Sequence, residues 1–103
     1  MMLQATLFAT TIESRFEAFH ARHPDVYRQL VRLAYEARRA GRERIGMKML
    51  FEVLRWEWTI AGLPDDAENW KLNNSYSSRY ARRIMEMYND LDGLFELREL
   101  KTP

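Results

Sequence analysis

The sequence predicts a mainly α-helical protein that forms a single domain of four helices. Apolar residues recur at helical spacing in four separate segments, helix-boundary residues flank these segments, and no internal repeat is visible. With 103 residues, 47% of them hydrophobic, the chain can enclose one core without metals or disulfides. We therefore expect residues 1–103 to form one domain, with residues 1–10 frayed.

The first two expected helices lie in the N-terminal half of the chain. Residues 11–21 carry an apolar stripe of Ile12, Phe16 and Phe19, and Thr10 or Thr11 is suited to cap this helix. The second helix opens at Pro24, because proline fits the first helical position, and stops at Gly41, where glycine can adopt the left-handed conformation. Its apolar stripe comprises Tyr27, Leu30, Val31, Ala34 and Ala37.

Residues 46–59 and about 75–88 are the third and fourth expected helices. The third has an apolar side made of Met47, Leu50, Phe51, Leu54 and Trp58, and Asn73 or Asn74 caps the fourth. Residues 62–72 between them are acidic and contain turn-forming residues, which indicates a surface loop. Apolar and polar residues alternate in Trp70–Leu72 and in Phe95–Leu97, so these segments could pair as a short two-stranded β-ribbon.

Charge is segregated along the chain although the net charge is only +1. Residues 28–48 hold seven basic and two acidic residues, a net charge of +5, and residues 79–83 add +3 without an acid. Residues 52–72 and 86–101 each carry a net charge of −3. Such a two-sided protein can direct one face toward a polyanion, and the same separation suits head-to-tail contact in a homodimer.

The strongest functional feature is the stretch from Asn73 to Arg83. On a helix, Arg79, Arg82 and Arg83 fall within an arc of about 100°, with Ser75 beside them. Such a face suits phosphate or base contacts, although exposed arginines often form a solvated face, here next to Glu86. The expected nucleic-acid-binding residues are Arg38, Arg39, Arg42, Arg44, Lys48, Ser75, Ser78, Arg79, Arg82 and Arg83.

Basic helices followed by a ribbon resemble helix-turn-helix and winged-helix DNA-binding domains. Ala37 and Gly41 stand four residues apart at the short turn between the second and third helices, as they often do in that motif. Glu36, Arg42 and Arg44, however, occupy positions where apolar residues are usual, and a long loop precedes the fourth helix. The resemblance thus implies a loose variant of this architecture.

The chain also resembles a group of small uncharacterised bacteriophage and prophage proteins. The segments that carry the resemblance are Phe19-His20, Pro24-Asp25-Val26-Tyr27, Phe51-Glu52-Val53-Leu54-Arg55-Trp56-Glu57, Leu72-Asn73-Asn74-Ser75-Tyr76, Arg79-Tyr80-Ala81-Arg82 and Phe95-Glu96-Leu97-Arg98. They span most of the chain after Thr11. The resemblance implies a shared fold and expression in the cytoplasm of a bacterial host, and it carries no established activity.

Other function classes have weaker support in the sequence. The chain lacks cysteine and shows no phosphate loop, nucleophile elbow or zinc-protease motif, so we expect neither an enzyme nor a cofactor. His20 and His23 lack further ligands at zinc-site spacing, and no run is long and apolar enough for a membrane span. The favoured function is nucleic-acid binding, with DNA as the preferred ligand, in a phage accessory or regulatory role. The alternative is an interaction module that inhibits or redirects a host protein through Trp56, Tyr76 and the arginines.

Overall fold

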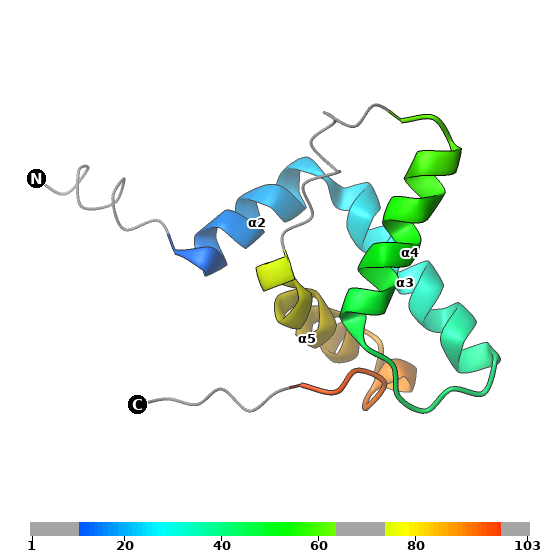
Figure 1. Ribbon diagram of the computed structural model, residues 1–103. Helices are drawn as coiled ribbons and strands as arrows, with labels where there is room; N and C mark the ends of the chain where they lie inside the picture. The colour runs from blue at the N-terminus through cyan, green and yellow to red at the C-terminus, as the bar shows by residue number, and fades with distance from the viewer. Residues whose placement is uncertain (1–10, 64–73, 98–103) are drawn as a thin grey trace, which may run out of the picture.

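Four α-helices and two 3-10 turns form in residues 11–63 and 74–97, the part of the chain that the computed structural model describes (Figure 1). The elements are α2 (Ile12–Arg22), α3 (Pro24–Arg39), α4 (Met47–Ile60), η2 (Asn74–Tyr76), α5 (Ser77–Met87) and η3 (Asn89–Leu91). The predicted mainly α-helical fold with four helices is confirmed. None of the helices described is both long and apolar enough to cross a membrane.

The helix ends follow the expected local chemistry at three places. Thr11 caps α2: its hydroxyl accepts from the Ser14 N–H at 3.1 Å, and the Ser14 hydroxyl accepts from the Thr11 N–H at 3.0 Å. Pro24 is the first residue of α3, as predicted. After α3 ends at Arg39, Gly41 adopts a φ of +89°, the left-handed conformation that glycine tolerates best.

The start of α5 differs from the prediction that an asparagine caps it. Asn74 opens the 3-10 turn η2, and Tyr76 occupies the cap position of α5 without a capping hydrogen bond from its side chain. Asn73 lies outside the described residues. The tighter turn places Tyr76 in the core, where its side chain is buried, so burial of this aromatic residue decides the local geometry.

The pairing of Phe95 also differs from the expected ribbon. Phe95 forms an isolated parallel bridge with Ile45, and the Ile45 N–H donates to the Leu94 carbonyl at 2.9 Å. The other expected strand, Trp70–Leu72, lies outside the described residues. Because Phe95 is buried and Ile45 packs against the same core, this bridge joins the segment before α4 to the segment after η3.

A single hydrophobic core lies between the helices, and α4 packs against both α3 and α5. Tyr80 is fully buried at its centre, with its ring centroid 4.8 Å from Phe16 and 6.1 Å from Phe51. Tyr80 is therefore a residue of the core. The buried side of α3 is turned slightly from its predicted stripe: Val26 and Leu33 are buried, whereas Tyr27 and Val31 are half-buried against the core.

Candidate nucleic-acid interface

A groove of about 890 Å³ opens where α4 and α5 begin. Segments distant in the sequence form its walls: the residues entering α4, the residues entering α5, and Glu96 with Leu97. Its lining residues are Arg44, Ile45, Gly46, Met47, Lys48, Met49, Asn74, Ser75, Ser77, Ser78, Ala81, Glu96 and Leu97. Four of the ten predicted binding residues, Arg44, Lys48, Ser75 and Ser78, therefore converge in one groove.

The groove is electrically suited to an anion. Arg44 and Lys48 are exposed, and neither forms an ion pair with another residue in the described ranges, while Glu96 is the one acid of the lining. Both α4 and α5 begin here without a side-chain cap and without an acid in the first turn. The first N–H groups of a helix lack intrahelical partners and carry partial positive charge, so the start of α4 reinforces the two side-chain cations, whereas α5 continues directly from the 3-10 turn η2.

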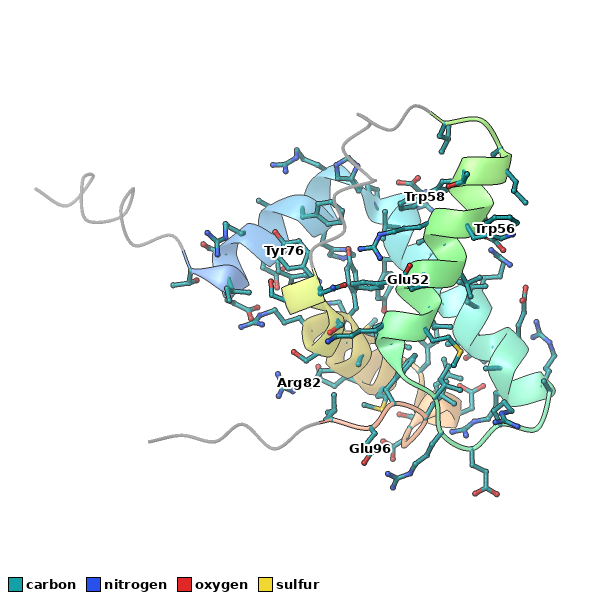
Figure 2. All side chains as sticks on the ribbon, viewed as in Figure 1. Glu52, Trp56, Trp58, Tyr76, Arg82 and Glu96 are labelled. Carbon is teal, nitrogen blue, oxygen red and sulfur yellow. The ribbon has the colours of Figure 1, made fainter. Side chains whose placement is uncertain are left out.

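Arg82 extends this cationic surface along α5. It lies one helical turn after Ser78, is half-buried, and forms no ion pair within residues 11–63 and 74–97. Arg82 is not part of the groove lining and borders a neighbouring hollow with Glu13 and Glu86, and Figure 2 labels it on α5. We refer to Arg44, Lys48, Ser75, Ser78 and Arg82 together as the α4–α5 surface.

The other two arginines of α5 are held by carboxylates of α2. Arg79 Nε lies 2.9 Å from Glu13 Oε1, and Arg83 Nη2 lies 2.5 Å from Glu17 Oε2. The Arg83 guanidinium also stands 5.3 Å from the ring centre of Phe16. Glu13 and Glu17 are four residues apart, as are Arg79 and Arg83, so two parallel ion pairs join the helices. These arginines contribute to the fold and are unavailable as free cations.

The carboxylates that bind Arg79 and Arg83 lie on a different helix from the acid that the sequence indicated. Helical spacing indicated Glu86 as an acid beside Arg82 and Arg83, whereas the ion pairs of Arg79 and Arg83 form with α2. Glu86 instead lines a smaller hollow of about 170 Å³ together with the three arginines of α5, Glu13 and Phe16. The matching spacing of four residues in both helices is the signal that could have indicated this pairing.

Arg38 also serves the fold. Its guanidinium donates four hydrogen bonds to backbone carbonyls, at 3.3 Å to Asp90, 2.9 Å to Asp92, 3.4 Å to Arg42 and 3.3 Å to Glu43. It thereby joins the end of α3 to η3 and to the loop that leads to α4. Its neighbours Arg39 and Arg42 are exposed, and neither belongs to the lining of the two hollows described above. These three residues therefore lie outside the α4–α5 surface.

The aromatic residues that could have stacked on bases are inside the protein. Tyr76 and Tyr80 are both buried, and the Tyr76 ring lies 5.7 Å from that of Phe16 and 5.4 Å from that of Phe19. Burial also raises the pKa of Tyr80. Tyr76 therefore cannot anchor a partner. Trp56, by contrast, is 63% exposed.

A metal site at His20 is not supported by the geometry. His20 stacks on Phe16 with ring centroids 6.0 Å apart and meets Tyr27 edge-on at 5.1 Å. Within the two described ranges, no three histidine or acidic side chains lie close enough together to hold a metal ion. Burial, followed by the charge of Arg83, lowers the pKa of His20, so the imidazole is neutral near pH 7.

Comparisons of the chain with models of protein families, with curated proteins and with solved structures find no match.

Proposed function

We propose that this protein binds nucleic acid, with DNA as the preferred ligand, through the α4–α5 surface. The observation that carries the proposal is the convergence of Arg44 and Lys48 with Ser75 and Ser78 around one groove. The two pairs are about thirty residues apart in the sequence, and both face the same space. A surface of this kind can follow the regularly spaced charges of a polynucleotide.

The proposed contacts are of two kinds: contacts with backbone phosphates that position the protein, and contacts with bases that recognise sequence. Arg44 and Lys48 stand at the start of α4, so they bind backbone phosphates together with the first N–H groups of that helix. Ser78 and Arg82 share the outer side of α5, which suits a base edge or a further phosphate. In helix-turn-helix proteins the first helix likewise crosses the backbone while the second enters the major groove.

The internal ion pairs support this arrangement indirectly. The ion pairs Arg79–Glu13 and Arg83–Glu17 hold α5 against α2, so that Ser78 and Arg82 remain on the side of α5 away from these pairs. Arg79 and Arg83 are therefore positioning residues in the proposal, and Arg38, Arg39 and Arg42 make no direct contact. We further propose an accessory or regulatory role in the cytoplasm of a bacterium, as the resemblance to phage and prophage proteins implies.

Salt-dependent binding by charge-matched variants tests the proposal. We expect the triple variant Arg44→Ala, Lys48→Ala, Arg82→Ala to bind a labelled DNA duplex roughly tenfold to a hundredfold more weakly. The dependence of log affinity on log salt should become less steep by about 2 to 3, because each lost phosphate contact contributes roughly 0.9. Fluorescence anisotropy over about 50 to 200 mM salt measures both quantities.

The matched control removes three exposed cations elsewhere. Arg28→Ala, Arg39→Ala, Arg42→Ala changes the net charge equally and leaves the α4–α5 surface intact. Equal losses in the two triple variants would mean that only overall charge matters, and wild-type protein that binds neither duplex nor single strand would refute the proposal. The same titration with single-stranded DNA and with RNA identifies the preferred polynucleotide.

The alternative function, interaction with a host protein, has lost one of its expected anchors because Tyr76 is buried. Purification from a nuclease-treated bacterial lysate separates the two functions: a host protein retained after nuclease treatment would favour the alternative. Trp56 remains exposed, and its surroundings lead to a different inference.

A further inference from the structure

Helix α4 is apolar on two opposite sides. One side lies in the core and consists of Met47, Leu50, Phe51, Leu54 and Trp58. On the other side, Met49, Trp56 and Ile60 are 58%, 63% and 64% exposed. Figure 2 shows Trp56 and Trp58 on opposite sides of this helix. Scattered exposed apolar residues are ordinary, but three that share one side of a single helix form a patch that a binding partner would cover.

The exposed residues follow the spacing of a helix-pairing seam. Together with half-buried Val53 and with Leu63 just beyond the helix, they make up the outer stripe: Met49, Val53, Trp56, Ile60 and Leu63. The intervals alternate between four and three residues, which is the a/d pattern of a coiled coil. A helix face exposed to water has no need of this alternating spacing, whereas a second helix can pack its side chains between residues spaced in this way.

We propose that the outer stripe binds the outer stripe of a second copy of this chain, with the two α4 helices antiparallel. In an antiparallel pair, each a position packs against a d position of the other helix. Met49 then faces Ile60 of the second copy, and Val53 faces Trp56 of the second copy. Both contacts recur by symmetry about a two-fold axis that passes between Leu54 and Arg55.

Two features of the stripe favour a second copy over another protein. From Met49 to Ile60 the intervals of the stripe are four, three and four residues, which read the same when reversed, as a two-fold interface requires. The pairing also sets the largest side chain, Trp56, against the smallest, Val53, so the central layers have space to interdigitate.

The charges beside the stripe are compatible with this pairing. Glu52 flanks one edge and meets Thr59 of the second copy, so no like charges oppose each other there. Glu57 flanks the other edge, and Arg32 of its own copy already binds it at 2.7 Å. Met49, Trp56 and Ile60 are each more than half exposed, so the two stripes together would cover on the order of 1,000 Å², near the lower limit of a specific interface.

Such a dimer would carry two α4–α5 surfaces. About fifteen residues of helix rise separate the two α4 starts in this register, so the two grooves lie roughly 22 Å apart along the helix pair. Met49 lines the groove as well as the outer stripe, whereas Trp56 and Ile60 do not line it. Substitutions at Trp56 and Ile60 therefore test self-association without changing the groove.

Molecular mass as a function of concentration tests the proposal. We expect wild-type protein to change from one chain to two as its concentration rises in sedimentation-velocity experiments. Trp56→Lys and Ile60→Lys should each remain monomeric over the same range. Lysine at position 56 lies one turn after Glu52, which favours the helix, and circular dichroism confirms that folding is retained.

The control is Met87→Lys on α5, because Met87 is 68% exposed but lies outside the outer stripe. It should dimerise as the wild type does. Wild-type protein that stays monomeric at all concentrations, or equal disruption by Met87→Lys, would overturn the proposal.

Cysteine cross-linking tests the antiparallel register directly, and the absence of native cysteine makes it selective. A mixture of Met49→Cys and Ile60→Cys proteins should form a mixed disulfide under mild oxidation. Met49→Cys alone should link poorly, because the two copies of position 49 are about 16 Å apart along the pair, beyond the roughly 7 Å that a disulfide spans. Efficient linking of Met49→Cys alone would indicate parallel helices and contradict the proposed register.

Discussion

The cations of α5 and those of the segment entering α4 differ in what surrounds them. Arg79 and Arg83 sit opposite two carboxylates of α2, while Arg44 and Lys48 face an open groove with one acid, Glu96. Both stretches are rich in positive charge in the sequence. Whether a cation is available to a ligand therefore depends on which helix packs beside it. The density of positive charge along the sequence does not determine this availability.

Arg38 and Arg39 of α3 also differ in that only Arg38 is held by other parts of the chain that the structure describes. Substitutions at these two positions give the largest expected effect on stability. Arg38→Ala removes four donated hydrogen bonds and leaves the carbonyls of η3 and of the loop without this donor. We expect the free energy of unfolding to fall by about 1–2 kcal/mol, measured by urea denaturation. Arg39→Ala, one position along, should change it by less than about 0.5 kcal/mol. Equal effects would show that the carbonyl contacts of Arg38 contribute nothing.

Releasing the arginines of α5 tests whether α2 neutralises them. Glu13→Gln with Glu17→Gln keeps the shape of both side chains and removes their charge. Arg79 and Arg83 then become free cations beside Arg82, so affinity for a DNA duplex should rise about tenfold, with a steeper salt dependence by up to roughly 2. Asp25→Asn with Asp92→Asn is the charge-matched control for the change in net charge, because both carboxylates are exposed and neither lines the two hollows. An unchanged salt dependence would mean that these arginines lie out of reach of the polynucleotide.

The strength of one internal pair can be measured by itself. Arg83→Ala and Glu17→Ala, alone and combined, form a double-mutant cycle. We expect a coupling energy of about 0.5–1 kcal/mol, because both side chains remain partly exposed to water, which weakens their attraction. Arg83→Ala alone should cost more than Glu17→Ala, since Arg83 also contacts the ring of Phe16. A coupling energy near zero would leave packing on Phe16 as the whole contribution of Arg83.

Much of the fold was predictable because it depends on local rules. The helical spacing of apolar residues, Thr11 as a cap, Pro24 at a helix start and Gly41 at a helix end all act within a few residues of the chain. The exceptions involve distant partners. Phe95 pairs with Ile45, fifty residues earlier, and the 3-10 turn before α5 follows from the burial of Tyr76 in a core that several helices build.

The candidate site was likewise predictable only where it depends on residue type and local spacing. Residue type and spacing indicated the groups that could bind an anion, and the structure brings Arg44, Lys48, Ser75 and Ser78 together. Spacing could not reveal that Arg79 binds a carboxylate 66 residues away, because helix packing determines that contact. For the same reason the donors of Arg38 find carbonyls 52 and 54 residues further along the chain.

The smallest expected effect concerns the dependence of stability on pH at His20, whose pKa is influenced by Arg83 of α5. Burial lowers the pKa of His20 below its ordinary value of 6.5, Arg83 lowers it further, and Glu17 partly opposes the shift. Near and below pH 6.5 the unfolded chain consequently binds more protons than the folded protein. The stability contributed by neutral His20 is present above that pH and is lost as the pH falls toward the lower folded pKa.

Denaturation at a series of pH values between about 5 and 8 measures this dependence. We expect His20→Gln to reduce the loss of stability below pH 6.5, the ordinary pKa of histidine. Arg83→Ala should reduce the loss in part, because it removes the second cause of the lowered pKa while burial remains. His23→Gln keeps His20 and should retain the loss. If His20→Gln lost stability with pH as steeply as the wild type, another group would be responsible, and the α5 arginines would exert no measurable influence on the core.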